Sequence, residues 1–429
     1  MKFRFFFDHP VNDGRMEIVN PHPDHHPLHT VQKEKAIIFI LAALQFLHIL
    51  DFVIMMPLGP VFMESFHIGS AEFGFLVSAY TFSAGIFGFI GAFFLDRFDR
   101  KHALLTVYTG FAFGTLLCAF APTYNTFLAA RIIAGGFGGV IGALVLSIIG
   151  DIIPIFRRGL ATGVVMSAFS VASVIGVPTG LYFANMYGWH FPFLALAILS
   201  FILLPVAARL LPRIRIHLDQ RNDGDKKWDS IRTVFTRTSH YRSFAFMIAL
   251  MFGGFTVIPF LSPYLVSNVG LTKEELPYIY FFGGLFTFFT SRIIGKLSDI
   301  YGKYPVYAIL AVLSIIPVSL ITSIGKTSLP VVVALTTVFM IIVSGRMVPA
   351  FAMVTSTVEP KIRGSFMSIN SSIQQIASGA ASFIAGLILT QEVDGSLTNF
   401  EFVGMLAVFS LLFSVYLASK IKIAEGPSS

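Results

Sequence analysis

The sequence predicts an all-α membrane protein with twelve spanning helices, arranged as two similar halves of six helices each. Three observations support this prediction: an apolar composition, a series of long apolar windows, and a polar loop that occurs twice. Of the 429 residues, 55% are hydrophobic and 12% are charged, whereas a soluble domain carries about 25% charged residues. So few charges cannot cover a soluble surface, which excludes soluble enzymes and nucleic-acid-binding domains.

The apolar windows give the number of spans. A helix that crosses a bilayer needs roughly 20 predominantly apolar residues. Twelve windows meet this need: 36–58, 71–94, 103–121, 126–149, 160–185, 190–211, 243–267, 276–296, 305–323, 329–356, 364–390 and 399–421. The window 329–356 is longer than a bilayer requires, so we expect it to be tilted or broken.

Positive charges give the expected orientation. Lys and Arg gather in the loops after the second, fourth, eighth and tenth windows and in the connection 212–242, and such residues favour the cytoplasmic side. The expected organisation is a cytoplasmic tail (1–35), a first bundle (36–211), a cytoplasmic linker (212–242), a second bundle (243–421) and a cytoplasmic tail (422–429). Both termini are therefore expected in the cytoplasm.

A polar loop that occurs once in each half shows that the two halves of the chain, separated by the connection 212–242, are related. The segment AFFLDRFDRKHAL follows the second window and GKLSDIYGKYPVY follows the eighth, so that Asp96 aligns with Asp299 at an offset of 299 − 96 = 203 residues. Similar loops at matching places indicate duplication of a six-helix unit. The second copy, 295–303, resembles the loop signature of the major facilitator superfamily. The resemblance implies a major facilitator fold, with two pseudo-symmetric six-helix bundles around a central cavity, and a transport function.

The first copy of the loop departs from that signature, because Ala92 and Asp99 stand where it prefers glycine. We therefore expect a different turn shape in the first half, with Asp99 tolerating left-handed backbone better than most residues.

The charges of these loops are candidates for a conformational gate. A carboxylate followed by cations at a helix end can form ion pairs in one conformation and release them in another. The gate candidates are Asp96, Arg97, Arg100, Asp299, Lys303, Arg157, Glu359 and Arg363. The alternative is that the cations serve only as topology signals.

The fourth window contains a glycine stripe and an arginine. Gly135, Gly138, Gly139 and Gly142 share one helical face, which predicts close packing against another helix. Arg131 lies inside the apolar span, where a guanidinium needs a cavity or a partner. The alternative is an arginine that extends to the membrane surface. The segment resembles a second superfamily signature, R-x-x-x-G-x-g-g.

The fifth window contains Gly176, Pro178 and Gly180. They loosely resemble the antiporter signature of drug-efflux members, G-x-x-x-G-P-x-x-G. Because proline removes a backbone hydrogen bond, we expect a kink here, beside small residues that allow helix packing.

The first window contains the most informative polar residues, Gln45, His48 and Asp51, followed by Met55, all roughly along one helical face. A carboxyl in apolar surroundings favours its protonated form, so Asp51 is our candidate proton carrier, with Arg131 and His48 supporting it. The segment also resembles the first helix of twelve-helix drug:proton antiporters, in which an acidic residue at this place carries the proton. The alternative is an Asp51 paired permanently with Arg131 or another cation.

The remaining candidates would line a substrate cavity: Gln45, Met55, Tyr80, Arg346 and Gln374. Arg346 stands next to Gly345 and ahead of Pro349, a combination that can break a helix and expose backbone to a cavity. The alternative is that Arg346 is a charge that serves helix packing. The single Cys118 and the absence of an ordered histidine motif predict no metal site, and we expect no cofactor.

The sequence thus predicts a monomeric multi-pass protein of a cell membrane, of the bacterial inner-membrane type, that is not an enzyme. Its expected partners are a small-molecule substrate, protons and the lipid bilayer, with no nucleic acid. The favoured function is proton-coupled export of small amphipathic or drug-like molecules by alternating access. Two alternatives stay open: proton-coupled transport of a specific metabolite such as a sugar or siderophore, and a non-transporting receptor or scaffold.

Overall fold

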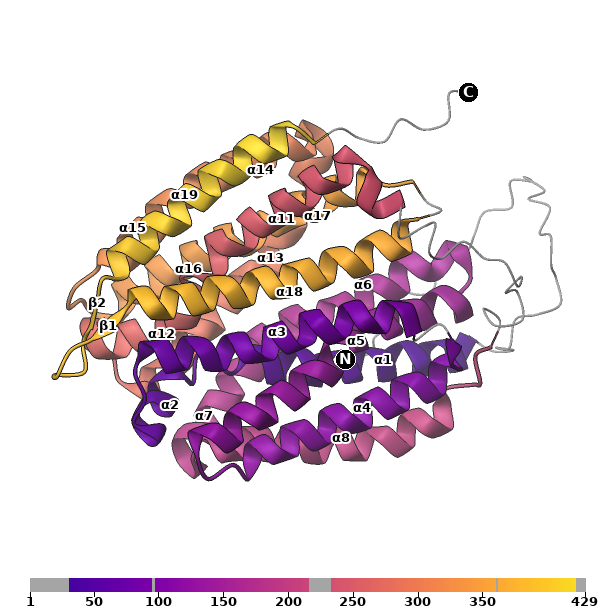
Figure 1. Ribbon diagram of the computed structural model, residues 1–429, viewed down its shortest axis with the longest axis horizontal. Helices are drawn as coiled ribbons and strands as arrows, with labels where there is room; N and C mark the ends of the chain where they lie inside the picture. Colours follow the sequence, from indigo (N-terminus) through magenta and orange to yellow (C-terminus); the bar gives the residue numbers. More distant parts are fainter. Residues whose placement is uncertain (1–30, 95–96, 216–232, 360–361, 422–429) are drawn as a thin grey trace.

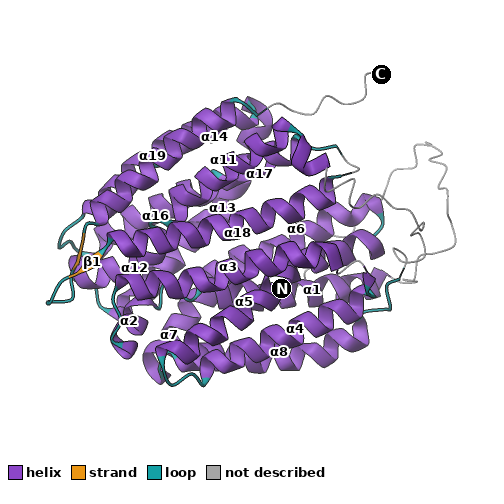
Figure 2. Ribbon diagram, viewed as in Figure 1, coloured by secondary structure: helices purple, strands orange, loops and turns teal. Residues whose placement is uncertain are grey.

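The computed structural model describes residues 31–94, 97–215, 233–359 and 362–421 (Figure 1). Helices make up nearly all of the described chain, and the strands of one short hairpin stand out at one end (Figure 2). The predicted all-α architecture is confirmed.

The helices of the first half are α1 (Val31–Val53), α2 (Gly59–Phe66), α3 (Ser70–Phe94), α4 (Arg100–Ala119), α5 (Tyr124–Ile152), α6 (Ile155–Val171), α7 (Val177–Tyr187) and α8 (His190–Leu210). The helices of the second half are α11 (Thr238–Phe255), α12 (Leu261–Tyr264), α13 (Leu276–Tyr301), α14 (Lys303–Leu313), α15 (Ile315–Ser323), α16 (Leu329–Gly345), α17 (Met347–Ser356), α18 (Arg363–Ile388) and α19 (Phe400–Ser419). Strands β1 (Thr390–Gln391) and β2 (Leu397–Thr398) pair antiparallel between α18 and α19, with Thr390 opposite Thr398.

Ten segments of the described chain are long and apolar enough to cross a membrane. They leave out α13 and α18, which contain 26 residues each and so extend roughly 39 Å, enough to cross a bilayer. Both are packed among the other long helices (Figure 1). The structure is therefore consistent with twelve spans.

Proline explains where several spans are broken. Pro178 cannot donate to the carbonyl of Val174, and a π-helical turn, Ala172–Gly176, joins α6 to α7 there. Pro349 likewise leaves the carbonyl of Gly345 without its helical donor, and α16 gives way to α17 at Arg346. This agrees with the expected break in the window 329–356.

Two boundaries differ from the sequence prediction. Helix α11 begins at Thr238 rather than at residue 243, because the polar segment TSHYRS continues the helix beyond the apolar window. The span that starts with α11 is also interrupted after Phe255, where the chain forms a short 3-10 turn, Ile258–Phe260, before α12. The hairpin β1–β2 was not predicted, because its strands contain two residues each.

The duplicated loops have different turn shapes in the two halves, as expected, but not by way of left-handed backbone at Asp99. Asp99 has φ −53° and its carboxylate caps α4 by accepting from the backbone N–H of Lys101 at 2.9 Å. Gly302 has φ +92°, which glycine adopts without strain. The expectation of left-handed backbone at Asp99 was therefore wrong, because a capping carboxylate holds that residue in an extended conformation.

The two halves share one hydrophobic core at one end only. We call this the hairpin end, since it contains α2 and the β1–β2 hairpin, and the opposite end, where α1 begins and α19 ends, the tail end. At the hairpin end one core joins both halves, with Phe62 and Phe73 of the first half beside Phe260 and Leu265 of the second. At the tail end the buried core residues of each half form a separate cluster, although Phe89 and Phe93 of α3 pack against that of the second half.

The halves also meet along their length. Helices α3 and α18 lie side by side (Figure 1), and a Cβ added at Gly74 of α3 would stand 2.8 Å from the carbonyl oxygen of Ser382 in α18. Glycine is therefore required for this close approach.

Candidate functional site

A buried ion pair lies in the first half, beside the end of α1. The guanidinium of Arg131 on α5 donates from Nη1 to Oδ2 of Asp51 on α1 at 2.8 Å. Both side chains are shielded from solvent, with exposures of 1% and 0%. The guanidinium does not extend to a surface, so the surface-seeking alternative for Arg131 does not describe this conformation.

Two further groups complete the surroundings of the pair. The hydroxyl of Thr115 on α4 donates to Oδ1 of Asp51 at 3.1 Å. The guanidinium carbon of Arg131 stands 4.2 Å from the ring centroid of Tyr80 and 6.0 Å from that of Phe193. Aromatic faces attract cations, so the ion pair is held by a hydroxyl on one side and by rings on the other.

Several buried polar atoms near the pair have no hydrogen-bond partner in the described chain. They are Oε1 of Gln45, both ring nitrogens of His48, the hydroxyl of Tyr80 and Nε of Arg131. A Cβ added at Gly138 would stand 2.6 Å from the hydroxyl of Tyr80 and 3.1 Å from Nε2 of His48, which shows that these two groups converge on Gly138. Since an unpartnered buried polar group is costly, this cluster is suited to bind polar atoms of a ligand or of water.

The glycine stripe of α5 packs as the sequence led us to expect. A Cβ at Gly135 would stand 2.4 Å from the carbonyl oxygen of Tyr80, and one at Gly139 would stand 2.1 Å from that of Ala84. Helices α3 and α5 can approach this closely only without side chains at these positions, and the approach brings Arg131 onto the ring of Tyr80.

The kink in the fifth span faces both α1 and the second half. A Cβ at Gly176 would meet Leu50 at 2.8 Å, and one at Gly180 would meet Ile54 at 2.2 Å. The π-helical turn before Pro178 approaches α13, where a Cβ at Gly284 would stand 2.9 Å from the carbonyl of Ser173.

The second half contains its own buried arginine, Arg346, whose side chain is fully shielded. It donates from Nη2 to the carbonyl oxygen of Gly253 at 3.0 Å and from Nη1 to the hydroxyl of Ser314 at 3.2 Å, and its Nε has no partner in the described chain. These acceptors are neutral, unlike the carboxylate that binds Arg131.

Two further cavity candidates are Met55 and Gln374. Met55 is buried in the core that joins both halves at the hairpin end. Gln374 is half-buried on α18. Its backbone carbonyl oxygen accepts a hydrogen bond from the hydroxyl of Ser378 at 2.8 Å.

The gate candidates of the first half, at the tail end, contact partners within that half. Arg100 donates to Asp151 at 2.5 Å, and Arg157 to Glu34 at 2.9 Å. Arg97 stands 5.3 Å from the ring of Phe94, and Asp96 lies outside the described residues.

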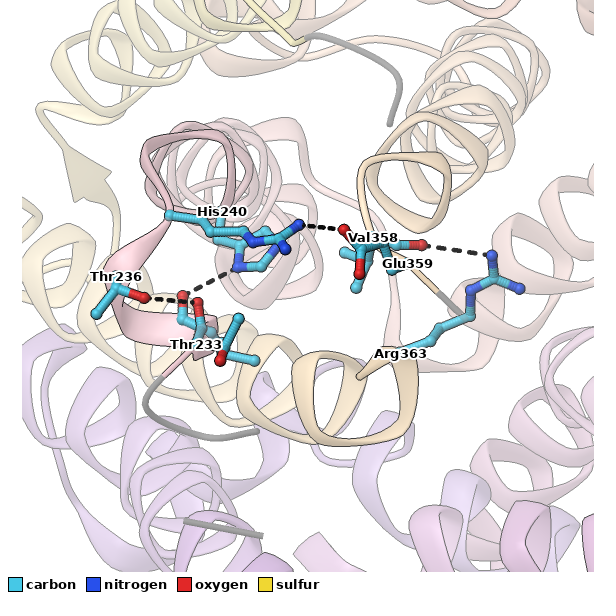
Figure 3. Close-up of polar contacts among 8 residues, drawn as sticks. Thr233, Thr236, His240, Val358, Glu359 and Arg363 are labelled. Atoms are coloured by element: carbon cyan, nitrogen blue, oxygen red, sulfur yellow. Dashed lines mark hydrogen bonds and ion pairs between the residues drawn. The ribbon is translucent and has the colours of Figure 1, made fainter. Parts of the chain in front are cut away.

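The gate candidates of the second half likewise contact their own half. Glu359 accepts from Arg237 at 2.6 Å, while Arg363 points to the carbonyl of Val358 at 3.4 Å (Figure 3). Lys303 donates to the carbonyl of Ala352 at 3.4 Å, and Asp299 is exposed at the end of α13.

Polar contacts that join the two halves occur at the hairpin end. Glu64 accepts from Lys273, whose carbonyl in turn accepts from Asn185 at 3.1 Å. Ser70 donates to the carbonyl of Leu389 at 2.7 Å. Together with the shared core, these contacts seal the halves against each other at this end.

Asp99 is a charged group outside the spans whose pKa is shifted, as is that of Asp394 in the hairpin loop. Burial raises its pKa, but hydrogen bonds donated by the backbone N–H groups of His102, Ile214 and Lys101 outweigh this and hold the pKa below its ordinary value. Its carboxylate also lies 3.5 Å from Arg215, so it fastens the chain after α8 to the start of α4.

Sequence reasoning missed Thr115, Ser314 and the inter-half pair of Glu64 with Lys273. Hydroxyls are common in membrane helices, so Thr115 and Ser314 carried no separate signal. Both lie on the third span of their half, but comparing the halves would not have found them, because Thr115 corresponds to Val318 at the offset of 203. Among the described residues, no group of three or more His, Cys, Asp or Glu side chains could hold a metal ion.

Known proteins resemble this chain in both sequence and fold. The family model for the Major Facilitator Superfamily matches residues 41–291 and 244–427. Among relatives, the chain is 26% identical over 312 residues to YbcL of Bacillus subtilis, an uncharacterized MFS-type transporter, covering 72% of this chain and 77% of YbcL. It is 30% identical over 165 residues to a second such protein, YceJ, covering 38% of this chain and 42% of YceJ.

Two solved structures share the fold. A bacterial homolog of the human lysosomal transporter Spinster, in an inward-facing and occupied conformation, has a TM-score of 0.73 at 14% identity, covering 93% of this chain and 100% of that one. A D-xylose-proton symporter has a TM-score of 0.71 at 17% identity, covering 89% of this chain and 97% of that one.

Proposed function

The chain belongs to the major facilitator superfamily, a family of membrane transporters rather than enzymes, and from that premise we propose that it is a proton-coupled secondary active transporter. Its proposed cargo is small amphipathic or drug-like molecules, which it exports by alternating access. The observation that carries the proposal is the buried pair of Asp51 and Arg131 beside the break between α1 and α2.

The pair can couple a proton to movement of the halves. Breaking a buried ion pair leaves an uncompensated charge at a cost of about 3–5 kcal/mol, and protonation of Asp51 removes one of the two charges. Arg131 is then free to bind other acceptors, and the helices that hold the pair, α1 and α5, can move apart. Asp51 thus exchanges its proton when the pair opens, with Thr115 stabilising the ionised form.

The polar cluster beside the pair is the proposed substrate site. Gln45, His48 and Tyr80 hold polar atoms that lack partners, and Phe52 stacks on Tyr80 with ring centroids 5.4 Å apart. A mixed aromatic and polar wall of this kind accepts amphipathic ligands. Gln374 and Arg346 contribute from the second half, and Met55 joins the wall when the shared core opens.

We further propose that the tail end faces the cytoplasm of a bacterial cell and that the chain works as a monomer in the inner membrane. Support for the orientation comes from the Lys and Arg residues of the tail end. The structure is then sealed on the outer side. In the opposite state, the gate charges would exchange partners within each half for partners across the halves.

Vesicle transport tests the proposal. The protein is reconstituted into lipid vesicles, a pH gradient is imposed, and uptake of three fluorescent probes is followed: ethidium, Hoechst 33342 and 1-naphthoate. We expect at least one probe to accumulate against its gradient, and this accumulation to stop when a proton ionophore collapses the pH gradient. The control is vesicles without protein. Equal probe uptake with and without protein would favour a scaffold, and uptake that the ionophore leaves unchanged would contradict proton coupling.

A further inference from the structure

The two halves can be aligned residue by residue along their first spans. The offset of 203 residues between the duplicated loops also relates five pairs of identical residues: Ala42 and Ala245, Leu47 and Leu250, Phe52 and Phe255, Leu58 and Leu261, and Pro60 and Pro263. The rings of Phe52 and Phe255 meet between the halves, with centroids 6.3 Å apart, as expected for equivalent residues beside a pseudo-twofold axis. At the same offset, Asp51 corresponds to Gly254, since 254 − 51 = 203.

The arginine sites of the two halves are built from equivalent helices. Arg131 lies on the fourth span of its half and Arg346 on the fourth span of the other. Each has a hydroxyl of the third span beside it, Thr115 at the Asp51 carboxylate and Ser314 at the Arg346 guanidinium. The second site is therefore built from the same spans as the first, with glycine at the place of the carboxylate. Its arginine and hydroxyl stand at other positions, because Arg131 corresponds to Ala334 and Thr115 to Val318 at the offset of 203.

The positive charge of Arg346 is only partly balanced. Its guanidinium donates to the carbonyl of Gly253, in the last turn of α11, and the carboxyl end of a helix acts as roughly half a negative charge. Within the described residues, no ion pair to a carboxylate accompanies it. A buried cation with half of its charge balanced is suited to bind an anion.

Gly254 places backbone without a side chain beside the guanidinium of Arg346. A Cβ at Gly254 would stand 3.4 Å from Nη2 of Arg346 and 3.6 Å from Ile258, which is ordinary van der Waals contact. The chain is broken immediately after this point, before the 3-10 turn at Ile258. Broken helices in corresponding positions of two halves mark binding sites in transporters.

We propose that Arg346 and the backbone at Gly254 recognise a carboxylate on the transported molecule. The neighbours Phe255 and Ile258 are apolar, which favours an amphipathic organic carboxylate over an inorganic anion. The inference rests on the proposed function and names its substrate class: a molecule with an apolar body and one carboxylate. The first half would handle the proton and the second half the negative charge of the substrate.

A binding experiment tests this without any proton gradient. Thermal unfolding of the purified protein is measured with 1-naphthoate, with the uncharged 1-naphthamide, and with inorganic phosphate. The variants are Gly254→Asp, which supplies a carboxylate beside Arg346, and Gly254→Asn, which adds nearly the same volume without charge. Arg346→Lys and Arg346→Gln keep and remove the positive charge.

We expect the wild-type protein to bind 1-naphthoate at least about tenfold more tightly than 1-naphthamide, a factor typical of one charge-assisted contact. Gly254→Asp and Arg346→Gln should lose this preference, while Gly254→Asn and Arg346→Lys should keep part of it. Without any ligand, Gly254→Asp should unfold at a higher temperature than Gly254→Asn, because its carboxylate neutralises the buried cation.

Three results would overturn the inference: equal stabilisation by the acid and the amide, equal stabilisation by phosphate, or a preference that survives in Gly254→Asp. If Gly254→Asp unfolds no higher than Gly254→Asn, Arg346 serves only to cap the broken helix, which also overturns it. None of these results bears on proton-driven uptake in vesicles, so the proposed transport function would stand or fall separately.

Discussion

Each half of the molecule contains a buried arginine, and the two arginines differ in the groups that accept their hydrogen bonds. In the first half the guanidinium of Arg131 binds a carboxylate at 2.8 Å. In the second, Arg346 binds a carbonyl and a hydroxyl. The first site is electrically neutral and contains a group that can take up a proton, whereas the second keeps a positive charge and contains no such group. Under the two proposals above, proton exchange belongs to the first half and recognition of a negative charge to the second.

The largest expected difference comes from the same substitution at both sites. Arg131→Gln leaves Asp51 buried without its cation, which should lower the free energy of unfolding by about 3–5 kcal/mol. Arg346→Gln should lower the free energy of unfolding by less than about 2 kcal/mol. It loses hydrogen bonds to neutral acceptors, but it also removes the free-energy cost of burying a charge. Thermal unfolding of both variants in the same detergent at neutral pH provides the measurement. Equal losses would mean that the two sites are electrostatically alike.

The hydroxyls allow a finer comparison. Thr115→Val removes the donor to Asp51 with little change of shape and should cost about 1.5–3 kcal/mol, the range for a hydrogen bond to a charged group. It should also move the pH profile of transport upward, since the ionised carboxylate loses a donor. The matched variant Ser314→Ala removes an acceptor of Arg346 and should leave that profile unmoved. A shift of similar size in both variants would argue against a special role for Asp51.

The duplicated loops differ in backbone geometry. Gly302 has φ +92° and ψ 148°, a region that essentially only glycine adopts, so Gly302→Ala should cost about 1–3 kcal/mol in thermal unfolding. Asp99→Asn should cost only a few tenths of a kcal/mol at neutral pH, because asparagine caps helices as well as aspartate does. A larger loss in Asp99→Asn than in Gly302→Ala would contradict the turn shapes described above.

The smallest effect is a pH dependence confined to the first loop. Because the pKa of Asp99 is lowered in the folded protein, its contribution to stability is complete above the unfolded-state value of about 3.9. That contribution is lost as the pH falls through the lower folded-state value. Unfolding curves at pH 3 and pH 6 should therefore differ less for Asp99→Asn than for the wild-type protein. An unchanged difference would assign the acid sensitivity to other carboxylates.

Much of the fold could be predicted because an apolar window or a proline determines the structure of its own segment, without reference to distant residues. The windows predicted twelve spans, with which the structure is consistent, and the pair Gly345 and Pro349 indicated the break at Arg346. The hairpin could not be predicted, because two-residue strands leave no alternating pattern. The start of α11 was missed because helix formation continued into polar residues after the apolar window ended.

The candidate site was predicted in its ionisable residues but not in its arrangement. A carboxylate and a guanidinium inside apolar spans each require a partner, which made Asp51 and Arg131 candidates for one another. Nothing in the sequence of one span specifies the neighbouring helix, so Thr115 and the ring of Phe193 could not be assigned. The lack of a carboxylate at Arg346 became visible only when the contacts of both halves were compared.

The proposed proton coupling depends most directly on Asp51 as the group that exchanges the proton. The decisive measurement is uptake of a transported probe into vesicles by Asp51→Asn, with and without a pH gradient, beside the control Asp51→Glu. We predict that Asp51→Asn loses accumulation driven by the gradient but still exchanges probe across the membrane at equal pH, and that Asp51→Glu keeps part of both. Gradient-driven accumulation by Asp51→Asn at the wild-type level would contradict the account and move the search for the proton carrier to other residues.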